Sequence, residues 1–267
     1  MAVPSIGVAS GKGGTGKTFT SVNLALHLAS RLGSVQMLDA DLGLGNSHLQ
    51  LGLRPEGHIQ HFLQGDMRLD ELVLESEYGV SLLPGGSGVS RLSHLEAGEI
   101  RRLGRGISNL DLRADALIVD SAAGISRQTL LFLRCCDFVV LVLQPELSSL
   151  TDAYALLKCL ILREHMVQVH VVVNRVYEEG EGIETFEKLQ DVSSRFLHFP
   201  LHYLGAVPED PMVRKALARK TPILIHDPGS PSARAMAAIG DRLIDCMAEL
   251  PQPEGRADFR TRILERS

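Results

Sequence analysis

The chain has 267 residues, of which 45% are hydrophobic, and this supplies enough apolar material for one large buried core. Aromatic residues make up only 4% and tryptophan is absent, so aliphatic side chains must fill that core, which favours a helix-covered α/β sheet over a β-sandwich. The formal charge of −5 and the pI near 6.1 argue against attraction to phosphate backbones, and direct DNA binding is therefore not expected.

The chain carries no sign of export or of a membrane span. Its four cysteines form no CxxC pair, and no charged-then-apolar signal segment precedes the first expected strand. No apolar run approaches the roughly 20 residues that are needed to cross a bilayer. We therefore expect a reduced, cytoplasmic protein, for which any contact with a membrane is peripheral.

Short apolar runs recur along the chain and are almost continuously apolar, as is typical of parallel strands that are buried on both faces. These runs are 6–9, 35–38, 80–83, 116–119, 138–143, 169–173 and 203–207. Between them, helical spacing of apolar residues predicts helices over 22–32 and 153–160, and a last core helix over 231–250. The pattern predicts a single doubly wound, mainly parallel β-sheet with helices on both faces, in one domain over residues 1–250.

A short basic tail follows this domain. Residues 251–255 (Pro-Gln-Pro-Glu-Gly) predict a linker, and residues 256–267 hold four arginines against two acids, a net charge of 4 − 2 = +2. Phe259, Ile263 and the adjacent Leu264 would give a helix in this tail a small apolar stripe flanked by arginines. Such a helix suits an anionic membrane surface, but a terminus that frays or docks on the core fits the same residues, because three apolar side chains bury little area.

A phosphate-binding loop follows the first expected strand and runs directly into a helix. It reads Gly11, Lys12, Gly13, Gly14, Thr15, Gly16, Lys17 and Thr18, which fits G-x-x-x-x-G-K-[ST]. The glycines let successive backbone N–H groups face one anion, and the helix N-terminus adds a partial positive charge. Lys17 is expected to reach the β- and γ-phosphates and Thr18 to bind Mg²⁺, so the sequence predicts a site for Mg-ATP.

Lys12 is unusual, because an ordinary phosphate loop does not require a lysine at that position. The run from Lys12 to Thr18 resembles the KGGxGK[ST] signature of the MinD/ParA family of dimerising P-loop ATPases. The resemblance implies an ATP-dependent homodimer in which Lys12 reaches across to the partner's ATP, as an arginine finger does. A solvated loop lysine is the simpler alternative.

Carboxylates close the second expected strand. Asp39 and Asp41 are two residues apart on a strand end, so they share one side at the edge where parallel sheets bind ligands. The resemblance matches Asp41 to the first switch, where it positions the attacking water, and Asp39 to a supporting position near the metal. Asn46 falls where the family has a residue near the dimer interface and the γ-phosphate. A capped turn after a strand is the alternative for Asp41 and Asn46.

A further apolar strand ends in Asp120, which is the Walker B arrangement of one carboxylate at the sheet edge that holds Mg²⁺, usually through water. Gly124 resembles the glycine of the second switch, whose N–H can report the γ-phosphate. Together with the phosphate loop and Asp41, Asp120 completes the expected metal and switch residues.

Base recognition is expected near the ends of the last two strands. Asn174 ends one strand, with Arg175 beside it, and a strand-end amide offers both the donor and the acceptor that an adenine edge needs. The resemblance places Asn174 on adenine and Pro208, Glu209 and Asp210 in a second base-contacting loop, although Pro208 could simply end a strand. The chain has no guanine-selective NKxD pattern here, so ATP is expected in preference to GTP.

Within the family, segment 145–158 strongly resembles FlhG/FleN-type regulators of flagellar number, and so do segments 39–46, 122–125 and 208–216. The resemblance spans roughly residues 4–250. It implies slow ATP hydrolysis that resets a monomer, and binding to a flagellar transcription activator of the AAA+ enhancer-binding type or to basal-body components.

Several alternative interpretations of the sequence remain beside the flagellar one. Thr151 and Asp152 within the resembling segment also fit as N-capping residues of a helix. Many relatives carry an N-terminal extension that stimulates the signal-recognition-type GTPase FlhF, whereas this sequence begins at its first strand, which leaves GTPase activation open.

A MinD-type division regulator and a ParA-type partition ATPase are the nearest alternatives. A metabolic enzyme such as a dethiobiotin-synthetase-like carboxylase would lack a lysine at Lys12, and an iron–sulfur carrier would need a cluster-binding Cys pair.

Overall fold

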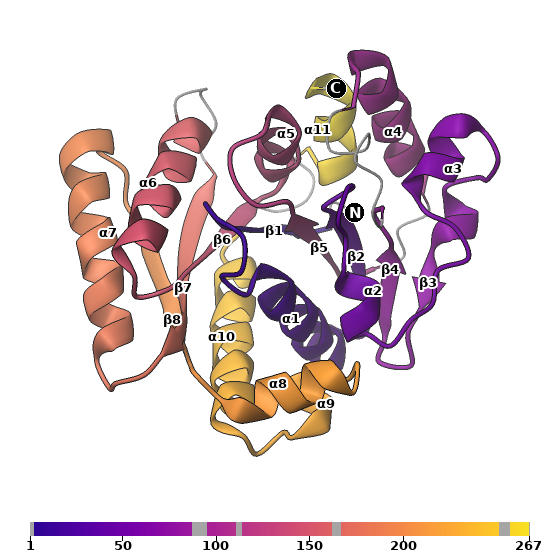
Figure 1. Cartoon of the computed structure of the whole chain (residues 1–267). Coiled ribbons are helices and arrows are strands. Elements are labelled where there is room, and N and C mark those ends of the chain that lie inside the picture. Colours follow the sequence, from indigo (N-terminus) through magenta and orange to yellow (C-terminus); the bar gives the residue numbers. More distant parts are fainter. Residues whose placement is uncertain (1–2, 87–94, 111–113, 162–166, 251–256, 267) are drawn as a thin grey trace.

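The computed structural model describes residues 3–86, 95–110, 114–161, 167–250 and 257–266. Its centre is an eight-stranded sheet in the order β3-β4-β2-β5-β1-β6-β7-β8, parallel except where β3 pairs with β4 (Figure 1). The strands are β1 Ser5–Ala9, β2 Val35–Ala40, β3 Leu74–Glu75, β4 Val80–Leu83, β5 Ala116–Ser121, β6 Phe138–Leu143, β7 Gln168–Val176 and β8 His202–Pro208. The expected single, doubly wound α/β sheet is confirmed.

Helices cover both faces of this sheet. They are α1 Lys17–Leu32, α2 Ser47–Gln50, α3 Ile59–Gln64, α4 Ala97–Asn109, α5 Arg127–Cys135, α6 Leu147–Ile161, α7 Glu181–Leu197, α8 Pro211–Ala218, α9 Ile223–His226, α10 Pro231–Ala248 and α11 Phe259–Arg266, with a 3-10 turn at η1 Asp70–Leu72. Figure 1 shows α1 and α10 on one face and α4, α5 and α6 on the other.

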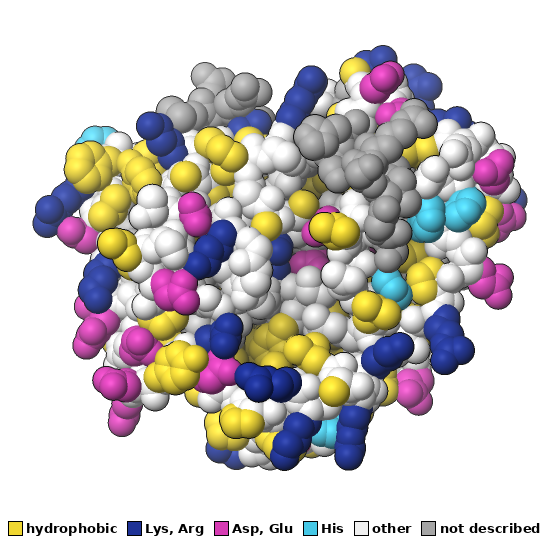
Figure 2. Space-filling view, viewed as in Figure 1, with side chains coloured by type: hydrophobic (Ala, Val, Ile, Leu, Met, Phe, Trp, Pro, Cys, Tyr) yellow, Lys and Arg dark blue, Asp and Glu magenta, His cyan; other side chains and the backbone are white. Residues whose placement is uncertain are grey.

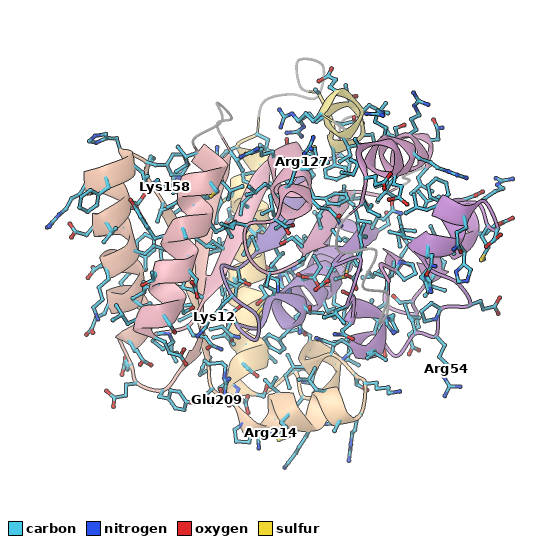
Figure 3. The ribbon with its side chains drawn as sticks, turned by 45° about the horizontal axis from the view of Figure 1, so that its top comes forward. Lys12, Arg54, Arg127, Lys158, Glu209 and Arg214 are labelled. Atoms are coloured by element: carbon cyan, nitrogen blue, oxygen red, sulfur yellow. The ribbon has the colours of Figure 1, made fainter. Side chains whose placement is uncertain are left out.

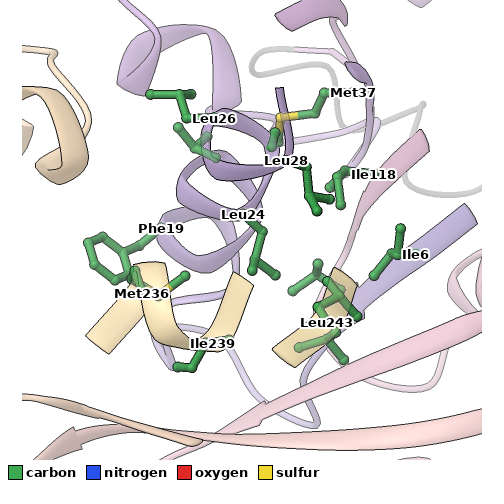
Figure 4. Close-up of a cluster of buried hydrophobic side chains, with 14 of the residues drawn as sticks. Ile6, Phe19, Leu24, Leu26, Leu28, Met37, Ile118, Met236, Ile239 and Leu243 are labelled. Carbon is green, nitrogen blue, oxygen red and sulfur yellow. The ribbon is translucent and has the colours of Figure 1, made fainter. Parts of the chain in front are cut away.

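Strand β6 shows why its sequence is apolar at every position. Val140 and Val142 pack into the cluster of α1 and α10, whereas the alternate residues Val139 and Leu141 pack into the cluster of α6. Successive side chains of a strand point to opposite faces, so a strand covered on both sides must be apolar throughout. Figure 4 shows the first of these clusters, in which side chains of α10 such as Met236 and Leu243 meet α1 and the sheet.

Two local expectations need correction. Helix α6 begins at Leu147, and the Thr151 hydroxyl donates to the Leu147 carbonyl within the helix at 2.9 Å, so Thr151 and Asp152 are not N-capping residues. The two-residue antiparallel strand β3 was not expected, because Leu74–Glu75 contains no apolar run.

The C-terminal segment forms helix α11, which docks on the sheet side that carries α4 and α5. Phe259 and Ile263 are 2% and 1% exposed and join the cluster under these helices, while Leu264 stays 44% exposed. Arg262 donates to Asp137 at 2.6 Å, which ties the helix to the start of β6. The linker expected at 251–255 lies outside the described residues. Among the helices that the structure describes, none is long and apolar enough to cross a membrane.

Candidate nucleotide site

The phosphate loop connects β1 to α1 and is built around close backbone approaches. Gly16 caps α1 with φ 96°, and a Cβ at this position would lie 2.1 Å from Asn174 Nδ2. A Cβ on Gly11 would lie 2.2 Å from the backbone of Asp152. Both positions therefore require glycine, because a side chain would collide with the residues that enclose the loop.

The loop presents polar groups to an open space. A Cβ on Gly13 or Gly14 would meet nothing within 4 Å. The hydroxyl of Thr15 is buried and has no hydrogen-bond partner among the described residues. Buried polar groups normally have partners, so an unpaired hydroxyl in a glycine loop at a helix N-terminus fits a loop that receives phosphate oxygens.

Two side chains from neighbouring strand ends brace this loop. Gln144, just after β6, donates from Nε2 to the Gly14 carbonyl at 3.2 Å, and Asn174 of β7 donates from Nδ2 to the Thr15 carbonyl at 2.8 Å. Asn174 therefore supports the loop and also lines the cavity described below. Gln144 was missed from the sequence, because nothing in its local pattern marks it.

Two buried carboxylates lie next to each other beside Lys17. Asp39 and Asp120 are partners in the register of β2 and β5, and each is 1% exposed. Ser21 Oγ donates to Asp120 at 2.8 Å and Ser47 Oγ donates to it at 3.1 Å. Burial raises the pKa of Asp39 to about 8, with a further contribution from the charge of Asp120, and burial raises the pKa of Asp120 as well, which the charge of Lys17 opposes.

This arrangement fits a divalent cation. Mg²⁺ prefers oxygen ligands and keeps several waters, and its charge would relieve the repulsion between Asp39 and Asp120. The Thr18 side chain lies close enough to Asp120 to lower the pKa of that carboxyl, so the three residues expected at the metal are gathered in one place. Ser21 and Ser47 belong to the same cluster but were missed from the sequence, because hydroxyl residues in such positions are common in helices and loops.

The expected switch residues lie around this centre but do not all point into it. Asp41 is partly exposed, and its carboxylate accepts from the Leu44 backbone N–H at 3.1 Å. Asn46 is exposed and precedes α2 without making a side-chain cap. The N–H of Gly124 donates to the Ser10 carbonyl at 3.0 Å, so it would have to leave this partner before it could contact a phosphate.

Lys12 is engaged at the start of α6. Its Nζ donates to Glu146 Oε2 at 2.7 Å and to Ser148 Oγ at 3.0 Å. The hydrogen bond from Lys12 lowers the pKa of Glu146. Figure 3 labels Lys12 beside the ribbon of the phosphate loop. Glu146 and Ser148 lie in the segment that carries the subgroup resemblance. Glu146 and Ser148 are, however, 134 and 136 residues away from Lys12 in the sequence.

The expected base-binding residues line one cavity of about 230 Å³ between the loop and α8. It is lined by Gly14, Gly16, Phe19, Asn174, Arg175, Val207, Pro208, Glu209, Asp210, Val213, Arg214 and Leu217. Phe19, Arg214 and Leu217 were missed, because they lie on helix faces that the sequence does not mark. Figure 3 places Glu209 and Arg214 together at this end of the sheet.

Two of these residues have a visible structural task. Arg175 has φ 61° and forms an ion pair with Glu209 across the rim of the cavity. The carboxylate of Asp210 caps α8 by accepting from the Met212 N–H at 2.8 Å, and it accepts from the Ser232 hydroxyl at 2.8 Å. The Asp210 side chain therefore shapes the cavity wall through α8 and α10, and its carboxylate is already engaged.

Comparison with known proteins points to one family. Residues 6–223 match the family described as the CobQ/CobB/MinD/ParA nucleotide-binding domain. The antiactivator FleN of Pseudomonas aeruginosa is 38% identical over 258 residues, which cover 96% of this chain and 91% of that protein. The flagellum site-determining protein YlxH of Helicobacter pylori is 31% identical over 265 residues, with coverage of 97% and 89%.

Solved structures agree with this fold. The septum site-determining protein MinD from Pyrococcus horikoshii, complexed with Mg-ADP, superposes with a TM-score of 0.77 at 26% identity, covering 92% of this chain and 98% of that one. MinD in the MinC:MinD cell division protein complex of Aquifex aeolicus superposes with a TM-score of 0.72 at 25% identity, with coverage of 94% and 98%.

Proposed function

Since this chain belongs to the CobQ/CobB/MinD/ParA family of nucleotide-binding domains, we propose that it is an ATP-dependent dimerising switch that regulates flagellar number or placement. Its similarity to the antiactivator FleN and to the flagellum site-determining protein YlxH supports the flagellar role. Its partner would be a flagellar transcription activator or a basal-body component. Slow ATP hydrolysis would return the dimer to monomers.

The residues around the loop suggest how the chain would handle the nucleotide. The loop N–H groups and Lys17 hold the phosphates, while Thr18, Asp39 and Asp120 hold Mg²⁺, which supplies positive charge to the β- and γ-phosphates. Asp41, which is partly exposed beside this centre, orients a water toward the γ-phosphate. Lys12 would leave Glu146 and reach the ATP of a second copy.

The observation that best supports a dimer is the surface that surrounds these loops. Leu44, Ile125 and Leu147 are 67%, 51% and 82% exposed, and they follow β2, β5 and β6. These strands are parallel to one another and to β1, which lies between β5 and β6 in the sheet. The three side chains that follow them therefore lie at the sheet edge that carries the phosphate loop. Exposed large apolar groups beside a nucleotide site suit a face that a second copy covers when ATP is bound.

Light scattering with Mg-ATP and with Mg-ADP tests this proposal. The native chain should double its mass with ATP only. Lys17→Ala should lose nucleotide binding and stay monomeric, whereas Lys12→Ala should still bind a fluorescent ATP analogue, because the loop keeps Lys17, but should stay monomeric. A persistent dimer of Lys12→Ala with ATP would contradict the role of Lys12, and near-normal ATP affinity of Lys17→Ala would contradict the site itself.

A MinD-type role at the division site is the second candidate, because the fold superposes on MinD structures. A ParA-type role in partition is the third. Pull-down from a flagellated cell with ATP, compared with ADP, separates them by the class of partner that is retained. Salt-sensitive, ATP-dependent retention on random DNA would favour the partition role instead.

A further inference from the structure

The outward face of α4 forms a basic hollow that no part of the proposed nucleotide site uses. This hollow, called here the arginine groove, has a volume of about 420 Å³. It is lined by Phe62, Gly98, Arg101, Arg102, Arg105, Gly106 and Asn109. Figure 2 shows several Lys and Arg side chains in this region, at the upper right of the molecule. The cavity for the base and the arginine groove share no lining residue.

One arginine of the groove is held in place by α3. Arg102 donates from Nη1 to the Leu63 carbonyl at 3.0 Å, and its guanidinium carbon lies 5.4 Å from the centre of the Phe62 ring. A guanidinium stacked on an aromatic ring and bonded to a carbonyl near a helix C-terminus has a fixed orientation. Arg102 and Phe62 therefore form an ordered wall for the groove.

The other two arginines have guanidinium groups that are available for a ligand. Arg101 and Arg105 are exposed, and neither guanidinium forms a hydrogen bond or an ion pair with any residue that the structure describes. They are four residues apart on one helix, so their like charges repel each other, and α4 has no acidic residue after Glu99 to offset them.

The fold does not require these charges. Helix α4 attaches to the core through Leu103 and Ile107, which are 2% and 3% exposed on its inner face. The arginines lie on the opposite face, on a protein with a formal charge of −5. Two arginines, Arg101 and Arg105, whose like charges cost helix stability and add nothing to the core suit a binding surface.

We propose that the arginine groove binds an acidic segment of a partner protein. Carboxylates of that segment would form forked, two-bond pairs with Arg101 and Arg105, the geometry that guanidinium groups favour. The helix from Gly98 to Asn109 is about 16 Å long, which matches about five residues of an extended peptide. The groove is concave, as suits a peptide better than a flat bilayer, and its three arginines are too few for a long track along duplex DNA.

The test uses the full-length protein and a fluorescein-labelled octaglutamate peptide, with binding followed by fluorescence anisotropy at low and at moderate salt. Arg101→Glu/Arg105→Glu should weaken binding at least about tenfold, as loss of two charge-assisted contacts does. The matched control is Lys215→Glu/Arg219→Glu on and just after α8, which reverses two exposed cations that are also four residues apart and should change affinity less than about twofold. Equal losses in both variants, or no loss in the arginine variant, would overturn the proposal.

Two further measurements sharpen this result. Arg101→Lys/Arg105→Lys keeps the charge but loses the forked geometry of the guanidinium groups, so it should weaken peptide binding about threefold. Unchanged affinity would show that the guanidinium geometry does not matter and would overturn the proposal. The arginine variant is also tested on phosphatidylserine vesicles and on a 30-base-pair duplex. If it loses binding to either while its peptide binding stays intact, the groove binds lipid or DNA, and the proposal is overturned. Circular dichroism checks that each variant is folded.

The peptide experiment is repeated with Mg-ATP and with Mg-ADP. Because the groove shares no residue with the nucleotide site, peptide affinity should be the same in both. Failure of ATP-dependent dimerisation would therefore leave the groove proposal standing, and failure of peptide binding would leave the dimerisation proposal standing.

Discussion

Asp41 is only partly buried, although it is the residue that we expect to orient the attacking water. Its carboxylate accepts from Leu44 and not from the buried cluster around Asp120, so removing it should leave the phosphate cradle intact. We expect Asp41→Ala to bind ATP and to dimerise, but to hydrolyse ATP at least about a hundredfold more slowly, because the attacking water loses its orienting group. Phosphate release at the native rate would reassign Asp41 to a turn cap.

His170 should make the stability of the protein depend on acid pH. It is 2% exposed on β7, between Phe138 and His202, and burial lowers the pKa of His170 to about 4, with a smaller contribution from His202. An unfolded histidine has a pKa near 6.5, so between these values the unfolded state binds more protons. The free energy of unfolding should therefore fall as the pH drops from about 6.5 to about 4, by at most about 1.4 kcal/mol per pH unit.

Urea denaturation across this pH range measures the effect. His170→Phe keeps the ring but cannot be protonated, so its slope with pH should be flatter than that of the native chain. His202→Phe should flatten the slope less, because the exposed His202 side chain at the start of β8 makes only the smaller contribution to the lowered pKa of His170. A native slope in His170→Phe would show that other groups dominate acid unfolding.

At the scale of single elements, α11 is part of the core and not a free tail. Phe259→Ala should lower the free energy of unfolding by about 3 kcal/mol, because it leaves a cavity under α4 and α5. Leu264→Ala, on the exposed side of the same helix, should change it by less than about 0.5 kcal/mol. Equal, small effects of both substitutions in urea denaturation would mean that α11 does not stay docked in solution.

The strands at the centre of the sheet could be predicted because they are buried on both faces, and the edge strand β8 still keeps an apolar run. Seven of the eight strands contain a run of apolar residues, and such a run can be recognised in the sequence without knowing which strand pairs with it. Strand β3 and the short helices α2 and α3 leave no such run, because they are too short and only partly buried. Their presence depends on the edge of the sheet and not on local pattern.

The same distinction applies to the candidate site. Residues of the phosphate loop, Asp39 and Asp120 could be proposed as site residues because each belongs to a short motif with its own spacing. The contact of Lys12 with Glu146 and the contact of Ser47 with Asp120 join residues 134 and 73 positions apart, so they follow only from the strand order. Their roles in catalysis stay predictions.

At the scale of the whole molecule, membrane binding would require a change in the position of α11. Its apolar side chains Phe259 and Ile263 are buried, so a membrane could take them up only after the helix leaves α4 and α5. One released helix would bind lipid weakly, whereas two in an ATP-bound dimer would gain avidity from their raised effective concentration.

Co-sedimentation with anionic liposomes checks this expectation. The full-length chain should sediment with ATP and much less with ADP, and a chain ending at Leu250 should not sediment with either. Equal sedimentation of both chains with ATP would eliminate α11 as an anchor. Equal sedimentation of the full-length chain with both nucleotides would eliminate the contribution of the dimer.

The position of α11 also has a consequence for how the protein is made. Phe259 and Ile263 complete a cluster whose other buried members all lie between residues 38 and 136. During synthesis these earlier elements emerge and begin to pack long before residues 259–266 leave the ribosome. Until then, an apolar cleft between α4 and α5 stays open to solvent, so nascent chains have a site that chaperones can bind and at which neighbouring unfinished chains can associate.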